Sequence, residues 1–119
     1  MLRMLVVDDH GPFRRIARML FDGDGFDVVG ESADGRSAIA DVERLRPDVM
    51  LLDVQLPDLS GFDVAQEVTD RWDPDGPTIV LMSTREGSDY GGRLDTATAA
   101  GFLTKAELSP PALHRLVGG

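Results

Sequence analysis

The sequence predicts an α/β fold in which a parallel β-sheet is covered by helices on both faces. Short, continuous apolar runs recur along the chain, as expected for strands that are buried on both sides. A segment with apolar residues at helical spacing follows each run. This alternation of strand and helix signals, repeated five times, is typical of parallel strands joined by helical crossovers.

The apolar runs place the strands. They lie at residues 4–7, 28–29, 49–52, 79–82 and 102–103. For a chain of 119 residues, this pattern fits the flavodoxin-like doubly wound fold, a (βα)5 chain with a five-stranded parallel sheet in the order 2-1-3-4-5. The length is that of one ordinary domain, so we expect residues 1–119 to form a single domain.

The first helix is expected to begin near Pro12, because proline suits the first helical position. Its apolar stripe has the spacing i, i+3, i+4, i+7 and consists of Phe13, Ile16, Ala17 and Leu20. Three basic residues lie on the other face, namely Arg14, Arg15 and Arg18. We expect the stripe to be buried and the arginines to be solvated.

The later helices have similar signals. The second should end before Pro47. The third has a capping-box-like start at Ser60, with Asp63 three residues on, and the last follows Ser109-Pro110-Pro111. Their apolar positions are Ala38, Val42 and Leu45, then Ala65, Val68 and Trp72, and finally Leu113, Leu116 and Val117. The segment 86–100 contains three glycines, each of which costs about 0.8–1 kcal/mol against alanine inside a helix. We therefore expect helical structure there to be short or frayed.

Composition and charge exclude several classes of function. The chain has no cysteine, which excludes disulfides and thiolate metal sites. Its net charge of −9 repels a phosphate backbone, so nucleic-acid binding by this chain is not expected. No apolar stretch approaches the ~20 residues that cross a bilayer, and the first residues lack the pattern of a signal peptide. We expect a cytoplasmic chain without membrane contact.

Polar residues follow four of the five apolar runs. Asp8 and Asp9 follow the first run, Asp53 the third, Ser83 the fourth and Lys105 the fifth. The carboxyl ends of parallel strands lie along one edge of a sheet, and ligands bind there where the strand order reverses. In the order 2-1-3-4-5 that point lies between the first and third strands. We therefore expect the three aspartates to be neighbours.

Three neighbouring carboxylates repel one another unless a cation lies between them. Mg²⁺ takes oxygen ligands and commonly uses one or two carboxylates together with phosphate. Lys105 and the Ser83 hydroxyl add donors suited to phosphoryl oxygens. A cation, a lysine, a hydroxyl and a nucleophilic carboxylate together indicate phosphoryl transfer onto an aspartate.

At these positions the chain resembles the receiver domain of two-component response regulators. The matching pieces are VVDDH at 6–10, LLDVQLPDLSG at 51–61, LMST at 81–84 and GFLTK at 101–105. They occur in the family's order and at its spacing, and the resemblance covers essentially the whole chain. It implies that residues 1–119 are a single receiver domain, which is a signalling phosphoacceptor rather than an enzyme.

The resemblance implies roles for the acidic residues and for one backbone group. Asp53 is implied to be the phosphoacceptor. Asp8 and Asp9 are implied to hold Mg²⁺ together with Asp53, and the backbone carbonyl of Gln55 is implied as a further ligand.

The resemblance also implies a switch and partners. The phosphoryl group comes from the phosphohistidine of a sensor histidine kinase or from a small phosphodonor. Lys105 contacts the phosphoryl oxygens, Ser83 moves toward them as the hydroxyl switch, and Phe102 turns inward as the aromatic switch. The face formed by segment 86–100, the fifth strand and the last helix is where a homodimer or an output partner is expected.

The two histidines are not expected to take part in the chemistry of the site. Mg²⁺ prefers oxygen ligands, so His10 is expected to be a loop residue without essential chemistry, and His114 is expected to face solvent.

One residue differs from the family's pattern. Ala106 follows Lys105 where most receivers have a proline in a cis peptide. A cis non-proline peptide costs about 2.5–4 kcal/mol, so we expect this peptide to be trans.

Other functions fit the sequence less well. A phosphohydrolase of the haloacid dehalogenase type needs a second acid where this chain has Gln55. In a flavodoxin-type carrier, Asp9 would repel the phosphate of FMN, and a dinucleotide enzyme needs a GxGxxG motif that is missing. A pseudo-receiver that interacts without being phosphorylated is the remaining alternative.

The output of the chain stays open. The segment GESADG at 30–35 resembles receivers that are joined to LuxR/NarL-type helix-turn-helix domains. If the chain is complete, it is a stand-alone receiver. If it comes from a longer protein, we expect a transcription regulator that binds DNA through another part.

Overall fold

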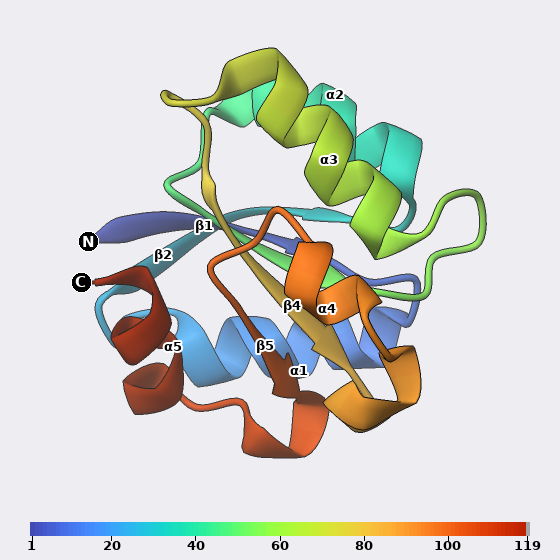
Figure 1. Ribbon diagram of the computed structural model, residues 1–119. Coiled ribbons are helices and arrows are strands. Elements are labelled where there is room, and N and C mark those ends of the chain that lie inside the picture. The colour runs from blue at the N-terminus through green and yellow to red at the C-terminus, as the bar shows by residue number, and fades with distance from the viewer. Residues whose placement is uncertain (119) are drawn as a thin grey trace.

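Strands and helices alternate along residues 1–118, the part that the computed structural model describes (Figure 1). The strands are β1 (Leu2–Val7), β2 (Phe26–Ser32), β3 (Val49–Asp53), β4 (Thr78–Ser83) and β5 (Gly101–Thr104). The α-helices are α1 (Gly11–Phe21), α2 (Gly35–Leu45), α3 (Gly61–Trp72), α4 (Arg93–Thr96) and α5 (Pro110–Val117). Two 3-10 helices, η1 (Gly87–Tyr90) and η2 (Lys105–Glu107), precede α4 and α5.

The strands form a parallel five-stranded sheet in the order β2-β1-β3-β4-β5. This is the predicted flavodoxin-like order, and it is confirmed. In the register, Met4 of β1 lies opposite Val49 of β3, and Asp53 at the end of β3 lies opposite Met82 of β4. The carboxyl ends of these strands therefore meet at one edge.

Helices cover both faces of the sheet, α2 and α3 on one side and α1 and α5 on the other (Figure 1). Successive residues of β1 alternate between these two cores. Leu5 and Val7 pack in the core under α2 and α3, whereas Met4 and Val6 pack in the core under α1 and α5. All four are fully buried, each contributing about 1.5–3 kcal/mol if it was exposed in the unfolded chain. Burial on both faces explains why the run is continuous.

Serine N-caps begin α3, as the sequence predicts, and also α5. The Ser60 hydroxyl accepts a hydrogen bond from the Asp63 N–H at 3.2 Å, and the Ser109 hydroxyl accepts one from the Ala112 N–H at 3.1 Å. Each bond satisfies one of the backbone donors that a helix leaves free at its start.

The start of α2 is capped twice, once from its own chain segment and once from the loop after β3. Asp34 accepts a hydrogen bond from the Ser37 N–H at 2.8 Å. The Asp58 carboxylate accepts the N–H groups of Gly35 and Arg36 at 2.8 and 3.0 Å. The bond from Gly35 is the main reason why the pKa of Asp58 is lowered. Asp58 thus ties the β3–α3 loop to α2.

The predicted burial of α1 is wrong at Ile16. Its side chain is 58% exposed, whereas Ala17 and Phe21 are buried. The helix turns its buried side toward positions 17 and 21, so Ile16 lies outside the contact with the sheet. A stripe of residues at helical spacing does not fix the rotation of a helix about its axis.

Two of the arginines on α1, Arg14 and Arg18, are only partly solvated, contrary to the prediction, since their side chains are 22% and 41% exposed and both pair with a glutamate. Arg14 Nε and Arg18 Nε lie 3.1 and 3.0 Å from the two carboxylate oxygens of Glu31 on β2. Arg18 also donates to the backbone carbonyl of Val28 at 2.9 Å. Arg15 is exposed as expected. The pairs arise because α1 packs beside the edge strand β2.

Segment 86–100 has little helix, as predicted. Both η1 and α4 contain four residues.

The only cis peptide bond among the described residues joins Asp73 and Pro74. The peptide after Lys105 is therefore trans, as predicted. No helix within residues 1–118 is long and apolar enough to cross a membrane.

His114 does not face solvent, and that prediction is wrong. Its ring stacks on Phe26 with a centroid distance of 4.3 Å, and Nε2 lies 2.9 Å from the Asp24 carbonyl oxygen. Gly25, with a φ of +91°, brings the turn so close that a Cβ there would lie 2.6 Å from the imidazole. The contact joins α5 to the turn before β2.

Replacing Gly61 by alanine is expected to lower the free energy of unfolding by about 1–3 kcal/mol. A Cβ at this position would overlap the Asp53 carbonyl oxygen and lie 2.7 Å from the Val54 Cα, so backbone must shift. Gly92→Ala is the matched control, since a Cβ there would enter open space. Urea unfolding followed by circular dichroism measures both, and equal losses would contradict the argument.

Candidate functional site

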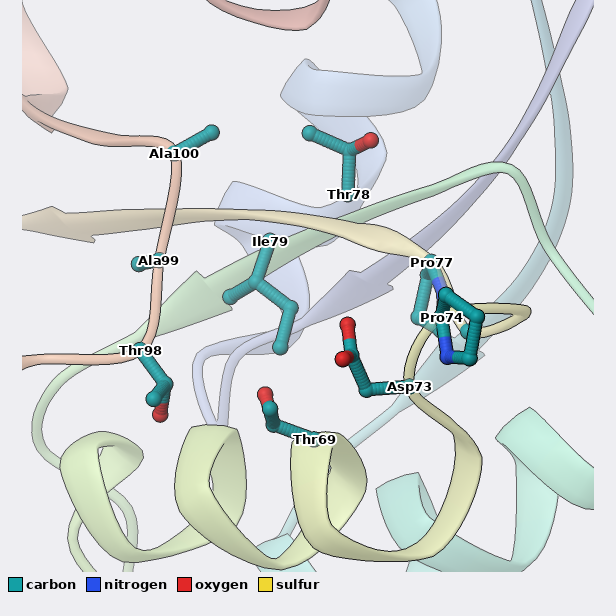
Figure 2. A pocket seen from close by; sticks show the side chains of 10 residues that line it. Thr69, Asp73, Pro74, Pro77, Thr78, Ile79, Thr98, Ala99 and Ala100 are labelled. Atoms are coloured by element: carbon teal, nitrogen blue, oxygen red, sulfur yellow. The ribbon is translucent and has the colours of Figure 1, made fainter.

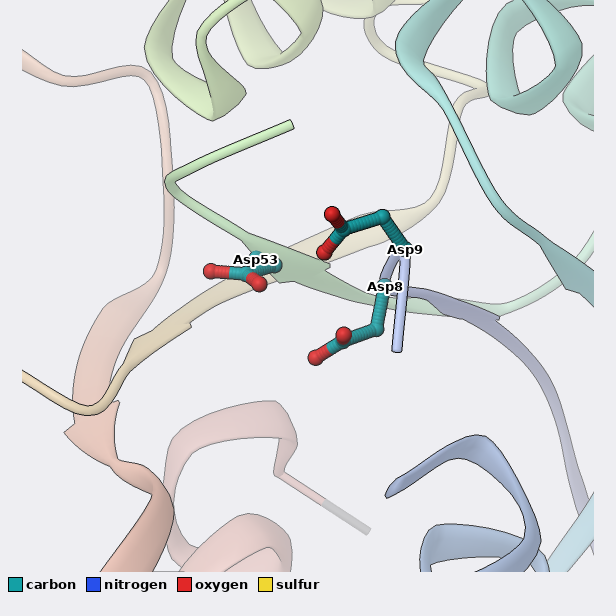
Figure 3. A group of neighbouring side chains, drawn as sticks. All are labelled: Asp8, Asp9 and Asp53. Atoms are coloured by element: carbon teal, nitrogen blue, oxygen red, sulfur yellow. The ribbon is translucent and has the colours of Figure 1, made fainter. Parts of the chain in front are cut away.

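The ends of β1 and β3 bring the three predicted aspartates together. Asp8 and Asp9 follow β1, and Asp53 is the last residue of β3. One carboxylate oxygen from each lies within 4.8 Å of the others. Figure 3 shows the side chains of Asp8 and Asp9 extending from the end of one strand toward the side on which Asp53 lies. The expected neighbourhood of these residues is therefore present.

Asp53 is a buried carboxylate, only 6% exposed. The N–H of Gln55 donates to its Oδ1 at 3.1 Å, and Lys105 Nζ lies 3.5 Å from its Oδ2. Burial raises the pKa of Asp53 from 3.8 to about 6; the Gln55 bond and Lys105 oppose this shift, and the charge of Asp8 adds to it. The carboxyl group is therefore more basic than an ordinary aspartate but is still mostly ionised at neutral pH.

Lys105 supplies the positive charge that the sequence beside Asp8 and Asp9 lacks. Its Nζ lies 2.6 Å from Asp8 Oδ2 as well as 3.5 Å from Asp53 Oδ2. The ammonium group also lies 4.3 Å from the ring centroid of Phe13 on α1, a cation–π contact. Lys105 comes from the end of β5, so this charge reaches the acids across the sheet edge.

Asp8 is fully buried, and its two oxygens have different surroundings. Oδ1 accepts the N–H of His10 at 2.8 Å. Oδ2 forms the ion pair with Lys105, but no residue within 1–118 gives it an aligned hydrogen bond. Arg14 donates to the Asp8 backbone carbonyl at 2.6 Å. Asp8 is thus held in place while one oxygen keeps free lone pairs.

Within the described residues, neither the Ser83 hydroxyl nor the Phe102 ring interacts with Asp53. Both side chains lie next to Tyr90. The Ser83 hydroxyl oxygen, buried at the end of β4, lies 2.5 Å from the Tyr90 hydroxyl oxygen and accepts the N–H of Arg85 at 3.0 Å. The ring of Phe102 lies 6.0 Å from that of Tyr90.

The sequence reasoning missed Tyr90. The available signal was that the chain's only tyrosine lies seven positions after Ser83 in an otherwise polar, glycine-rich segment.

Gln55 and His10 contact the aspartates through their backbone N–H groups. The Gln55 N–H donates to the Asp53 carboxylate, and Gln55 pairs with Ser60 in an isolated antiparallel β-bridge. His10 is an exposed N-cap of α1 whose N–H binds Asp8. Ligation by the Gln55 carbonyl stays a prediction.

A surface hollow at the other end of the sheet is not part of this site. It is lined by the end of α3, the start of β4 and residues 98–100. Figure 2 shows Thr69 and Asp73 from the α3 side facing Ile79 of β4 across it. The three clustered aspartates do not line it, so their chemistry belongs to the opposite edge.

The arrangement at the carboxyl edge combines two chemical properties. Clustered carboxylate oxygens favour a hard divalent cation. A buried carboxylate of raised pKa, with a lysine ammonium beside it, can act as a nucleophile toward an electrophile whose oxygens carry negative charge. Both properties converge on Asp53.

Comparison with known proteins finds one family. The sequence pattern of the response regulator receiver domain matches residues 4–117. Response regulator GacA of Pseudomonas viridiflava is 40% identical over 106 residues, which are 88% of this chain and 49% of that protein. The chain therefore spans about half the length of this relative.

Two further comparisons agree with this. The protein-glutamate methylesterase/protein-glutamine glutaminase of Alkalilimnicola ehrlichii is 41% identical over 110 residues, 87% of this chain and 27% of that protein. Among solved structures, the signal receiver domain of the putative response regulator NarL from Mycobacterium tuberculosis has a TM-score of 0.83 and 31% identity. That match covers 99% of this chain and 97% of the other.

The raised pKa of Asp53 predicts a pH-dependent loss of stability. Between 3.8 and about 6 the folded chain binds more protons at this residue than the unfolded chain, so ionisation on raising the pH destabilises the fold. Asp53→Asn removes this effect. Without divalent cations at pH 7.5, we expect the variant to gain on the order of 2–3 kcal/mol in free energy of unfolding over the parent chain.

Urea unfolding of both chains from pH 4 to pH 8 measures this difference. It should shrink as the pH falls toward 4. A difference between the two chains that stays constant over this range would contradict the raised pKa.

Proposed function

The chain belongs to the response regulator receiver domain family of two-component systems, and we propose that Asp53 is its phosphoacceptor. In this proposal residues 1–119 are one cytoplasmic receiver domain, a signalling phosphoacceptor that takes a phosphoryl group from a histidine kinase or a small phosphodonor. The observation that carries the proposal is the buried Asp53 carboxylate, clustered with Asp8 and Asp9 and in contact with Lys105.

The proposed reaction is an in-line displacement at phosphorus. An Asp53 carboxylate oxygen attacks the phosphorus of a phosphohistidine, forming a P–O bond as the P–N bond breaks. The electron pair of the P–N bond stays on the imidazole nitrogen, and the product is an aspartyl phosphate. With its pKa near 6, Asp53 is mostly ionised at neutral pH and more basic than an ordinary aspartate, which favours attack.

Lys105 and Ser83 are the proposed partners of the phosphoryl oxygens. Lys105 Nζ lies 3.5 Å from Asp53 Oδ2, so its charge is next to any group carried by that carboxylate. Ser83 follows Met82, the residue of β4 that pairs with Asp53 in the sheet. Its hydroxyl therefore starts from the neighbouring strand end and can turn toward the new phosphoryl group. Phe102 remains the proposed aromatic switch on β5.

The acidic cluster fits Mg²⁺. Its donors are oxygens only, within 4.8 Å of one another, and Asp8 Oδ2 is a buried oxygen without an aligned hydrogen bond from the described residues. Asp8, Asp9 and Asp53 would hold the ion, with the Gln55 carbonyl as a further ligand. When bound, Mg²⁺ would neutralise charge on the carboxylates and on the phosphoryl oxygens.

The proposed output follows from the relatives. GacA is named as a response regulator and is about twice as long as the matched segment, and the NarL match is a receiver domain. We propose that this chain is the receiver of a LuxR/NarL-type transcription regulator or a stand-alone receiver, and that DNA is bound elsewhere. The α4-β5-α5 face is the proposed contact with a second copy or an output partner.

Mg²⁺ is expected to stabilise the fold through Asp9. At ten times its dissociation constant a ligand adds about 1.4 kcal/mol, which corresponds to roughly 5 °C in melting temperature for a domain of this size. Asp9→Asn, a change at an exposed residue, should lose most of this gain. Asp75→Asn, an exposed acid outside the cluster, is the control. Equal Mg²⁺ responses in all three chains would contradict the site.

Incubation with acetyl phosphate and Mg²⁺ is expected to add one phosphoryl group to the chain. Intact-mass spectrometry measures the adduct, which should be absent from Asp53→Asn and from samples treated with a chelator. Loss of the adduct at alkaline pH would identify it as an acyl phosphate. A folded chain that gives no adduct with any phosphodonor would favour the pseudo-receiver, in which the same fold interacts without phosphorylation.

A further inference from the structure

We propose that Tyr90 is a positioning residue that holds the Ser83 hydroxyl away from Asp53, and that phosphorylation of Asp53 releases it. This inference rests on the proposed function of Asp53. In this proposal segment 87–96 responds to the state of Asp53 through one hydrogen bond. Tyr90 thus acts in addition to Ser83 and Phe102, the switch positions of the family.

The direct evidence is the environment of the Ser83 hydroxyl. Its oxygen lies 2.5 Å from the Tyr90 hydroxyl oxygen and accepts the Arg85 N–H at 3.0 Å. Ser83 is 1% exposed, so water does not compete freely for these bonds. A serine hydroxyl has one proton and two lone pairs. A phosphoryl oxygen can accept only that proton. In this proposal the proton lies in the bond with the Tyr90 hydroxyl, so Ser83 can donate it near Asp53 only by releasing Tyr90.

The ring of Tyr90 is fixed from two sides, which makes its hydroxyl a defined partner. It packs edge-on against Phe62 of α3 at a centroid distance of 5.7 Å and against Phe102 of β5 at 6.0 Å. Arg93 lies 4.4 Å above the Phe62 ring. These three rings, from α3, η1 and β5, form one aromatic cluster between the sheet edge and α4.

The surrounding segment can move at low cost. Tyr90 ends the four-residue η1, and the four-residue α4 follows after two glycines. Helices this short retain few internal hydrogen bonds and depend on tertiary contacts. Withdrawal of Ser83 toward a phosphoryl group would remove the polar anchor of Tyr90 and leave its ring held by packing alone. The change at Asp53 would thereby reach η1 and α4.

The single tyrosine of the chain makes the test specific. With tyrosine labelled by ¹³C at Cζ, one NMR resonance reports the Tyr90 hydroxyl. Acetyl phosphate and Mg²⁺ should shift this resonance in proportion to the phosphorylated fraction from intact mass. Ser83→Ala should shift it in the same direction without a phosphodonor. Ser88→Ala, which removes an exposed hydroxyl from the same turn, should leave it unchanged.

The rate of phosphorylation provides a second readout. Tyr90→Phe keeps the ring and removes the bond, so its initial rate with acetyl phosphate should rise roughly fivefold, the effect of one partly buried hydrogen bond. An unchanged or lower rate would overturn the proposal.

The two proposals fail in different ways. An adduct that forms without any shift of the tyrosine resonance overturns the role of Tyr90 and leaves Asp53 as the phosphoacceptor. A chain that forms no adduct overturns both.

Discussion

The structure depends on keeping one ionisable carboxylate buried among other acids at the edge of a sheet. Asp53 is 6% exposed, and Asp8, beside it, is fully buried. Taking such charges out of water is unfavourable unless a counter-charge and hydrogen bonds compensate. Lys105 and the N–H groups of Gln55 and His10 provide this compensation. The strand order matters because it brings groups from β1, β3 and β5 to one point.

The loop that follows Asp53 is fixed at several points. The Gln55 N–H binds the Asp53 carboxylate, Asp58 caps α2, and the Gly61 N–H donates to the Val54 carbonyl at 2.7 Å. Gly61 also lies so close to the backbone of β3 that a side chain would not fit. These contacts hold the Asp53 carboxylate in a defined orientation, as the proposed in-line reaction requires.

The segment after β4 is built differently. Its helical parts are short, and the aromatic cluster and the hydroxyl contact between Ser83 and Tyr90 join η1 to the rest of the fold. The β3–α3 loop is thus held by bonds to backbone groups, whereas η1 is joined to Ser83 and Phe102 through the side chain of Tyr90. This asymmetry supports a switch in which η1 and α4 respond and the β3–α3 loop does not.

Local patterns in the sequence determined the strands, the helix caps, the weakness of segment 86–100 and the polar residues at the strand ends, because each depends on neighbouring residues. The parallel α/β topology then predicted that Asp8, Asp9 and Asp53 would meet. Other features depend on contacts between distant segments, whose distances and rotations no periodicity encodes. Such contacts decided that Ile16 is exposed, that His114 stacks on Phe26, and that Lys105 pairs with Asp8. They also placed Tyr90 against Ser83, and they made burial the main cause of the raised pKa of Asp53.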